Sequence, residues 1–301
     1  MALIDLCSER LDVTVSTLGG TLLRLDARRG AACLPILRPA PRDATVPALR
    51  SACFPLVPFG NRVRGNSFTC AGQPYTLAPN QPWDEHYLHG DGWLNQWALE
   101  QSDERSATLV YEHAANPATP YAYRAMQRFE LSGNALTMTL CVTNRGAALP
   151  FGLGWHPYFV LEADTLLQAP ARSYWTEREQ YLPGAEAPVP EALDFRRGAR
   201  LPRHWVNNGF GGWDGAAHIA WPSRGLDLSI EAPGAAYYFV FVSDTQFDPH
   251  YHHDYFCFEP MTHAADSHAS PDPRGLVTLA AGAQMALTMR LAVSISAGAR
   301  R

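Results

Sequence analysis

Every second residue of Met285-Ala-Leu-Thr-Met-Arg-Leu-Ala-Val-Ser-Ile295 is a large apolar one, and smaller or polar residues fill the positions between. Because successive side chains of a β-strand point to opposite faces, this alternation predicts a long strand with one buried face. The segment Leu136–Val142 repeats the alternation, and Leu11–Val15 and Leu226–Ile230 are shorter copies. Such segments, spread over the whole chain, favour a fold built from strands.

Turn residues connect these segments. Ser132-Gly133-Asn134 separates Tyr123–Leu131 from Ala135–Val142 and predicts a hairpin, because Gly and Asn accept positive φ angles. No sustained apolar stripe with helical spacing is found, and 24 Pro and 23 Gly interrupt the chain throughout. We therefore predict an all-β fold, a large antiparallel β-sandwich of two packed sheets.

The 301 residues suit one large domain or two ordinary ones, and we expect a single domain over residues 1–301. The Pro-rich segment Pro170–Pro202 is interpreted as long connections over one face. The tail Ser296–Arg301 is expected to be frayed.

Composition excludes several functions. All 24 basic residues are Arg, so neither Schiff-base lysine chemistry nor a phosphate-binding Walker lysine is possible. The net charge of −5 and the absence of arginine runs exclude nucleic acid as an expected partner. Six scattered cysteines without a C-x-x-C pair, no signal-peptide pattern and no membrane-length apolar run predict a cytoplasmic protein with reduced thiols and no membrane partner.

Glu259 and His156 are the candidate acid–base residues. Glu259 lies among Tyr255, Phe256 and Phe258, where burial would raise its pKa and suit it as a base. The alternative is a structural Glu paired with an arginine. His156 precedes Pro157, which favours an extended backbone and a fixed direction for the imidazole. The alternative for His156 is a half-buried structural histidine.

Two loops carry candidate binding residues. His89 precedes Gly90, which lets backbone approach a ligand closely, and Arg62 follows Asn61 in a Gly- and Pro-rich loop. The alternatives are a surface histidine and a surface salt bridge. The run Asp248–Asp254 contains metal-ligand types, but its adjacent histidines would point to opposite faces, so an exposed loop is the preferred interpretation.

In order along the chain, the candidate motifs are Pro58-Phe-Gly-Asn-Arg62 with Gly65, Leu88-His-Gly90, His156-Pro-Tyr-Phe159 and Glu259-Pro260. Together they resemble the aldose 1-epimerase (galactose mutarotase-like) family from about residue 10 to residue 295. The resemblance implies the supersandwich fold of that family and an isomerase that interconverts the α and β anomers of a free aldose. It implies a monosaccharide as partner, no metal and no cofactor, and we expect a monomer or homodimer.

The resemblance also implies roles for single residues. Glu259 matches the general base at the C1 hydroxyl, and His156 matches the general acid at the ring oxygen. His89 matches a hydrogen-bond donor near the ring oxygen, and Arg62, beside Asn61, matches the substrate-binding arginine. Asp214, in Gly211-Gly-Trp-Asp-Gly215, matches the hydroxyl-binding aspartate. In the general chemistry of ring opening, the acid and the base are expected on opposite sides of the sugar.

Departures from the family pattern leave the sugar open. Galactose-type members continue Asn-Leu after the His-Pro-Tyr-Phe motif, where this chain has Val160-Leu161. One alternative is a hexose-6-phosphate mutarotase, for which Arg62, Arg64 and Arg124 are the candidate phosphate ligands. Another is a non-catalytic sugar-binding protein, and a metal hydrolase that uses the His250–Asp254 run is the least favoured.

Overall fold

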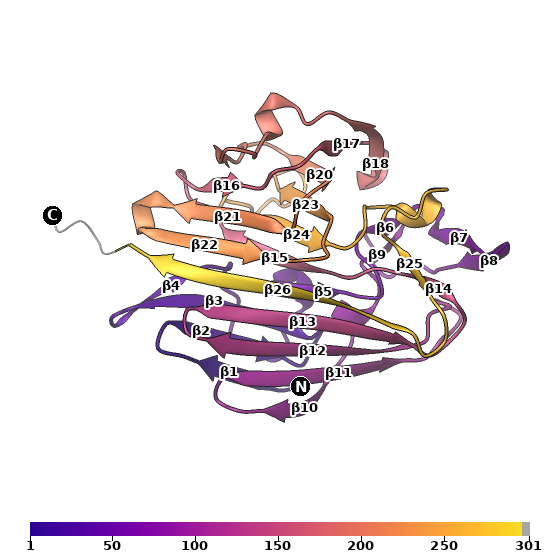
Figure 1. Ribbon diagram of the computed structural model, residues 1–301, viewed down its shortest axis with the longest axis horizontal. Coiled ribbons are helices and arrows are strands. Elements are labelled where there is room, and N and C mark those ends of the chain that lie inside the picture. The colour runs from indigo at the N-terminus through magenta and orange to yellow at the C-terminus, as the bar shows by residue number, and fades with distance from the viewer. Residues whose placement is uncertain (297–301) are drawn as a thin grey trace.

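The computed structural model describes residues 1–296 and consists mainly of antiparallel strands (Figure 1). The expected fraying of the tail lies, apart from Ser296, outside the described residues. Helical segments within residues 1–296 are short 3-10 turns: η1 (Ala48–Arg50), η2 (Arg64–Asn66), η3 (Gly92–Leu94), η4 (Glu179–Tyr181), η5 (Glu191–Leu193), η6 (Pro222–Arg224) and η7 (Ser267–Ala269). Among residues 1–296, no helix is long and apolar enough to cross a membrane.

The larger sheet has 11 strands. In spatial order they are β1 (Leu3–Cys7), β2 (Leu11–Ser16), β3 (Thr21–Arg29), β5 (Cys53–Leu56), β15 (Gly154–Val160), β24 (Tyr255–Met261), β23 (Tyr237–Val242), β20 (Val206–Gly211), β17 (Ser173–Glu177) and β18 (Pro183–Ala187), while β4 (Ala32–Pro35) pairs with β3.

The second large sheet has nine strands. They are, in order, β10 (Ala98–Ser102), β11 (Ser106–His113), β12 (Tyr123–Ser132), β13 (Ala135–Asn144), β26 (Gln284–Ile295), β22 (Leu226–Glu231), β21 (Ala216–Trp221), β16 (Leu166–Gln168) and β19 (Ala199–Arg200). Three two-stranded pairs complete the fold: β14 (Leu149–Phe151) with β25 (Val277–Leu279), β6 (Arg62–Val63) with β9 (Tyr87–Leu88), and β7 (Ser67–Cys70) with β8 (Gln73–Thr76).

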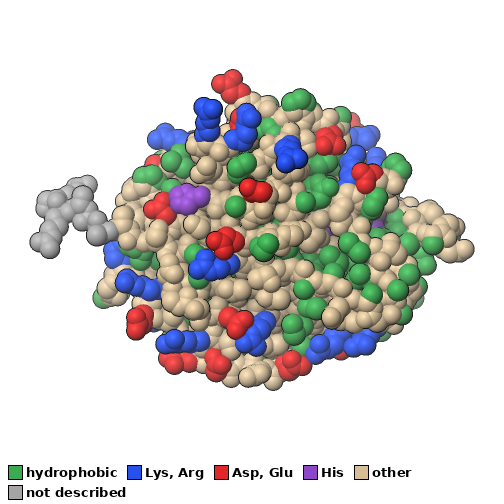
Figure 2. Space-filling view, viewed as in Figure 1, with side chains coloured by type: hydrophobic (Ala, Val, Ile, Leu, Met, Phe, Trp, Pro, Cys, Tyr) green, Lys and Arg blue, Asp and Glu red, His purple; other side chains and the backbone are tan. Residues whose placement is uncertain are grey.

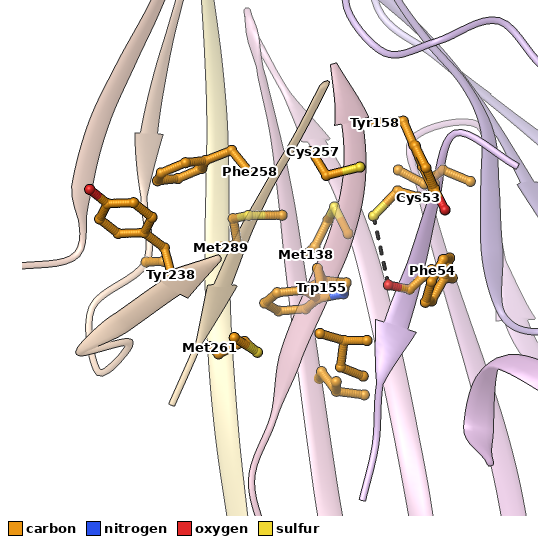
Figure 3. Close-up of a cluster of buried hydrophobic side chains, with 14 of the residues drawn as sticks. Cys53, Phe54, Met138, Trp155, Tyr158, Tyr238, Cys257, Phe258, Met261 and Met289 are labelled. Carbon is orange, nitrogen blue, oxygen red and sulfur yellow. Dashed lines mark hydrogen bonds between the residues drawn. The ribbon is translucent and has the colours of Figure 1, made fainter. Parts of the chain in front are cut away.

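The two large sheets pack face to face, with the nine-stranded sheet across the front of the view in Figure 1. Along β13, buried residues such as Met138 and Leu140 alternate with half-buried threonines. Figure 3 shows Met138 and Met289 beside Trp155 and Phe258 of the opposite sheet. The outer face of the nine-stranded sheet carries interspersed charges of both signs (Figure 2). The nine-stranded sheet is therefore buried on one face only, as the alternating sequence predicts.

The predicted strands are confirmed, and so is the hairpin between β12 and β13. The interpretation of Pro170–Pro202 as connections alone is wrong, because β17, β18 and β19 lie within it. These are short strands near sheet edges, with β17 and β18 mostly half-buried or exposed, so they lack the alternation that marks a strand with one buried face.

The centre of the larger sheet is buried on both faces. All seven residues of β24 are buried, as are the first six of β15. Trp155 and Phe258 point into the space between the sheets, so His156 and Glu259, the next residue on each strand, point to the opposite face. Loops from the first third of the chain cover that face, and the candidate site lies there.

Replacement of Leu140, which is fully buried between the sheets, tests this packing. Leu140→Ala should lower the free energy of unfolding by about 2–5 kcal/mol because it leaves a cavity. Thr139→Ala, one residue away on the outer face, should cost less than about 1 kcal/mol. Urea denaturation measures both, and equal losses would contradict the assigned faces.

Candidate active site

His156 and Glu259 form the centre of the site. Strands β15 and β24 pair with Gly154 opposite Met261 and Tyr158 opposite Cys257, so positions 156 and 259 face each other midway between these pairs. His156 Nε2 lies 3.3 Å from Glu259 Oε1. The exposed fractions are 7% for His156 and 2% for Glu259, so the two groups meet in a nearly dry environment. Glu259 thus has a histidine as its partner, where the alternative interpretation expected an arginine.

Burial acts on the two groups in opposite directions. It raises the pKa of Glu259 well above 4.5, which Arg62 partly offsets, and it lowers the pKa of His156 from 6.5 to about 3. Both shifts favour the uncharged forms, a protonated carboxyl beside a neutral imidazole. The pair therefore holds one proton over a wide pH range, and that proton can sit on either partner without changing the net charge.

Two buried polar atoms of this pair have no hydrogen-bond partner in the part of the chain that the structure describes. They are Glu259 Oε2 and His156 Nδ1. Unpaired buried acceptors and donors are rare in folded proteins, and these two are free to bind a polar ligand. The remaining contacts of the imidazole are aromatic, with the Phe54 ring stacked at 4.5 Å and the Tyr158 ring at 4.7 Å.

His89 reaches the same cluster from a loop. Its ring lies 5.3 Å from that of His156, edge to face. His89 and Asn61 both adopt positive φ angles, and their backbones are joined because His89 N donates to Asn61 O. The backbone N of Asn61 donates to His89 Nδ1 at 3.0 Å, so in the neutral imidazole Nε2 carries the proton and is a donor. Burial lowers the pKa of His89 well below 6.5, which keeps it neutral, and the surface alternative for His89 is wrong.

Arg62 is fixed by Asp84. Its Nε and Nη2 lie 2.8 and 2.7 Å from Asp84 Oδ2, and both side chains are buried. The guanidinium also lies 5.0 Å from the ring of Tyr181. This is a buried ion pair at the edge of the site, where the alternative interpretation expected a surface salt bridge.

Asp214 is not brought to the cluster. It is exposed in the turn between β20 and β21, where its Oδ1 accepts a hydrogen bond from Ala216 N. The preceding Trp213 contacts Phe258, which faces the inter-sheet core and not the site. The hydroxyl-binding role of Asp214 stays a prediction that no contact of this residue supports.

Other residues with suggested roles lie elsewhere. The run Asp248–Asp254 lies in the loop between β23 and β24 and is mostly exposed, in line with the preferred interpretation. Arg64 pairs with Asp266, and Arg124 pairs with Glu100 and Glu112, so neither is a free phosphate ligand.

Several residues of the site were missed in the sequence. Tyr158 and Cys257 lie two positions from His156 and Glu259, so the period of two could have placed all four on one face. His156, Cys257 and Glu259 offer metal-ligand atoms within 4.8 Å of one another, and these are the residues that could hold a metal ion. Asp84 gave no signal, because its pairing with Arg62 depends on how two loops meet.

A cleft of about 670 Å³ lies next to the cluster: Tyr158, which contacts His156, is part of its wall, whereas His156 and Glu259 are not. Its wall includes the aromatic residues Trp83, Tyr158, Tyr181, Phe247 and Tyr255, together with Arg38, Arg50 and Asp248. Tyr158 and Tyr181 lie directly against His156 and Arg62, so they join the cleft to the buried cluster. Aromatic walls with a few fixed polar groups suit the C–H faces and hydroxyls of a sugar.

Comparison with solved structures defines the fold class. A galactose mutarotase-like protein from Clostridium acetobutylicum superimposes with a TM-score of 0.82 over 97% of this chain and 95% of that chain, at 16% identity. A crystal structure from Escherichia coli K12 superimposes with a TM-score of 0.92 at 46% identity, over 98% and 99% of the two chains. The expected galactose mutarotase-like sandwich is thereby confirmed.

The sequence comparisons narrow the class to a family. The uncharacterized protein YphB of Escherichia coli (strain K12) is 47% identical over an alignment of 292 residues, which covers 93% of this chain and 99% of that protein. The aldose 1-epimerase family pattern matches residues 2–292. The chain belongs to the aldose 1-epimerase family, as its motifs predict.

The Arg62–Asp84 pair gives a stability prediction. Asp84→Ala leaves a buried guanidinium without a counter-charge and should lower the free energy of unfolding by about 3–5 kcal/mol. Glu130→Ala, which breaks the exposed pair with Arg128, should cost less than about 1 kcal/mol. Urea denaturation of both variants provides the comparison, and a small loss for Asp84→Ala would show that Arg62 does not depend on it.

Proposed function

We propose that this protein is an aldose 1-epimerase that interconverts the α and β anomers of a free aldose, with Glu259 as base and His156 as acid. The observation that carries the proposal is the buried contact of 3.3 Å between His156 Nε2 and Glu259 Oε1, beside an aromatic-walled cleft. Membership in the family supports the same class of reaction.

The proposed reaction needs only two proton transfers. The Glu259 carboxylate takes the proton of the O1 hydroxyl, the C1–O5 bond breaks, and His156 gives its proton to O5. The product is an open aldehyde with a free hydroxyl at C5. After rotation about C1–C2 the ring closes on the other face of the aldehyde, and both protons return. At the end of each cycle, Glu259 and His156 are in the protonation states in which they began.

The geometry of the pair suits this chemistry in a way that differs from the sequence-based expectation. The two groups are neighbours and do not face each other across a sugar. Neighbouring groups are suitable because O1 and O5 are both bonded to C1. The uncharged pair that burial favours is the state the cycle reaches when the ring is open.

Surrounding residues are proposed to hold the sugar. His89 would donate from Nε2 toward the ring oxygen, since its Nδ1 is occupied by Asn61 N. Arg62 would donate to a hydroxyl, held by Asp84. The reaction requires no cofactor and no metal ion, and a cytoplasmic location remains part of the proposal.

Glu259→Gln tests the role of the base. An amide keeps the size of the side chain but cannot accept the proton, so kcat for mutarotation should fall about 10²- to 10⁴-fold while sugar binding persists. Polarimetry on freshly dissolved α-anomers measures the rate. Glu231→Gln, an exposed position on β22, is the matched control and should retain the wild-type rate. A Glu259→Gln rate close to that of the wild type would remove Glu259 from the mechanism. If the wild-type protein binds a sugar but does not accelerate its mutarotation, the non-catalytic alternative is favoured.

The pH dependence of kcat/KM should be bell-shaped with a broad plateau. Activity requires one proton on the pair, so it falls where a second proton binds and where the last proton leaves. Because the pKa of His156 is lowered to about 3, the acid limb should lie far below 6.5; because the pKa of Glu259 is raised, the alkaline limb should lie well above 4.5. Circular dichroism at each pH distinguishes the acid limb of the activity profile from acid unfolding of the protein. An acid limb near 6.5 in folded protein would contradict the assignment.

A further inference from the structure

Arg38 lies in the wall of the cleft and has no acidic partner. Its Nη2 donates to the main-chain oxygens of Leu49 and Ser51 at 2.9 and 2.7 Å, and no carboxylate within residues 1–296 forms an ion pair with it. Two arginines of the neighbouring loops, Arg62 and Arg64, each have an aspartate as partner. Arg38 is therefore a cation whose counter-charge is not supplied by the part of the chain that the structure describes.

The guanidinium of Arg38 is held in one orientation. It stacks over the Tyr158 ring at 3.7 Å and over the Tyr255 ring at 4.5 Å. Both hydrogens of Nη2 are engaged by the two carbonyls, while Nε and Nη1 have no partner among residues 1–296. A fixed planar group with free donors is suited to two oxygens of a carboxylate or phosphate.

A second cation adds to the positive charge. Arg50 lies between the two residues whose carbonyls hold Arg38, and it lines the same cleft without an ion pair in the described chain. Among residues 1–296, Asp248 is the one acidic residue in the cleft wall, and its Oδ1 accepts a hydrogen bond from His250 N. Two arginines against one aspartate leave the wall with an excess of positive charge.

The position of Arg38 relates the positive charge of the cleft wall to the exocyclic group of a sugar. The Tyr158 ring contacts both Arg38 and His156. In the proposed function His156 serves O5, and O5 is bonded to C5, the carbon that carries the exocyclic group of a hexopyranose. In that arrangement an exocyclic group directed past Tyr158 would reach Arg38. This step rests on the proposed function.

We propose that the cleft takes an aldose with an anionic exocyclic group at C5, a carboxylate or a phosphate, and that Arg38 is the residue that binds this group. Arg62, Arg64 and Arg124 are committed to carboxylates and do not serve this purpose.

The test compares acidic with neutral aldoses. Mutarotation of glucuronate, galacturonate, glucose 6-phosphate, glucose and galactose is followed with wild type, Arg38→Gln and the control Arg105→Gln. Arg105 is exposed in the turn between β10 and β11, so its replacement makes the same charge change away from the cleft. For the preferred acidic sugar, Arg38→Gln should lower kcat/KM about 10- to 150-fold, chiefly through KM, as expected for a hydrogen bond to a charged group. For neutral sugars the change should stay below about threefold.

The same measurements distinguish a carboxylate from a phosphate as the anionic group. Preference for the hexuronates identifies a carboxylate, preference for glucose 6-phosphate identifies a phosphate, and either supports the proposal. Equal losses for neutral and acidic sugars in Arg38→Gln, or a wild-type preference for neutral sugars, would overturn it.

A second measurement tests the anion site even if the protein is not an epimerase. If no sugar is accelerated by folded wild type, tryptophan fluorescence titration with glucuronate, glucose 6-phosphate and glucose decides the question of binding. Tighter binding of an acidic sugar that Arg38→Gln weakens at least about tenfold supports the anion site without turnover. Equal binding of all three, unchanged by Arg38→Gln, would overturn it. Arg38→Lys, which keeps the charge but loses the planar fork, should retain part of the preference.

Discussion

The site depends on the pairing of β15 with β24 at the centre of the larger sheet. The register of these strands sets His156 opposite Glu259, and the sheet is covered on both faces, so the carboxyl and the imidazole meet away from water. Burial disfavours the charged form of each group, yet the two together can exchange one proton without any change in net charge. A pair that accepts and returns a proton at little electrostatic cost is the physical basis of the proposed epimerase.

The covering loops give this pair its surroundings. Asn61 and His89 adopt positive φ angles, and their mutual backbone contacts fix which nitrogen of His89 carries the proton. Asp84 neutralises Arg62 at the edge of the cluster. The cleft wall differs, because Arg38 is anchored by neutral carbonyls and no carboxylate of the described residues compensates its charge. The acid–base centre is thus electrically balanced, while the wall beside it carries the positive charge that we relate to substrate choice.

Sequence patterns were informative where one face of a strand is buried. The alternation in β13 and β26 gave the strands and the fold class, and the apolar surroundings of Glu259 indicated a buried carboxylate. The same reasoning failed for β17 and β18, which are short, lie at one end of the larger sheet and so show no alternation. The role of Asp214 came from the family resemblance alone and stays a prediction; the structure places this residue in an exposed turn.

The sequence by itself determined the strand-rich fold, the family and the identities of the acid–base candidates, because hydrophobic periodicity and local motifs are properties of neighbouring residues. Only the tertiary structure decided that His156 and Glu259 touch, that Arg62 is neutralised by Asp84, and that Arg38 lacks a counter-charge. These facts join segments from 22 to 103 residues apart, or concern the absence of a partner within residues 1–296. Such contacts arise from sheet register and loop packing, which no local pattern encodes.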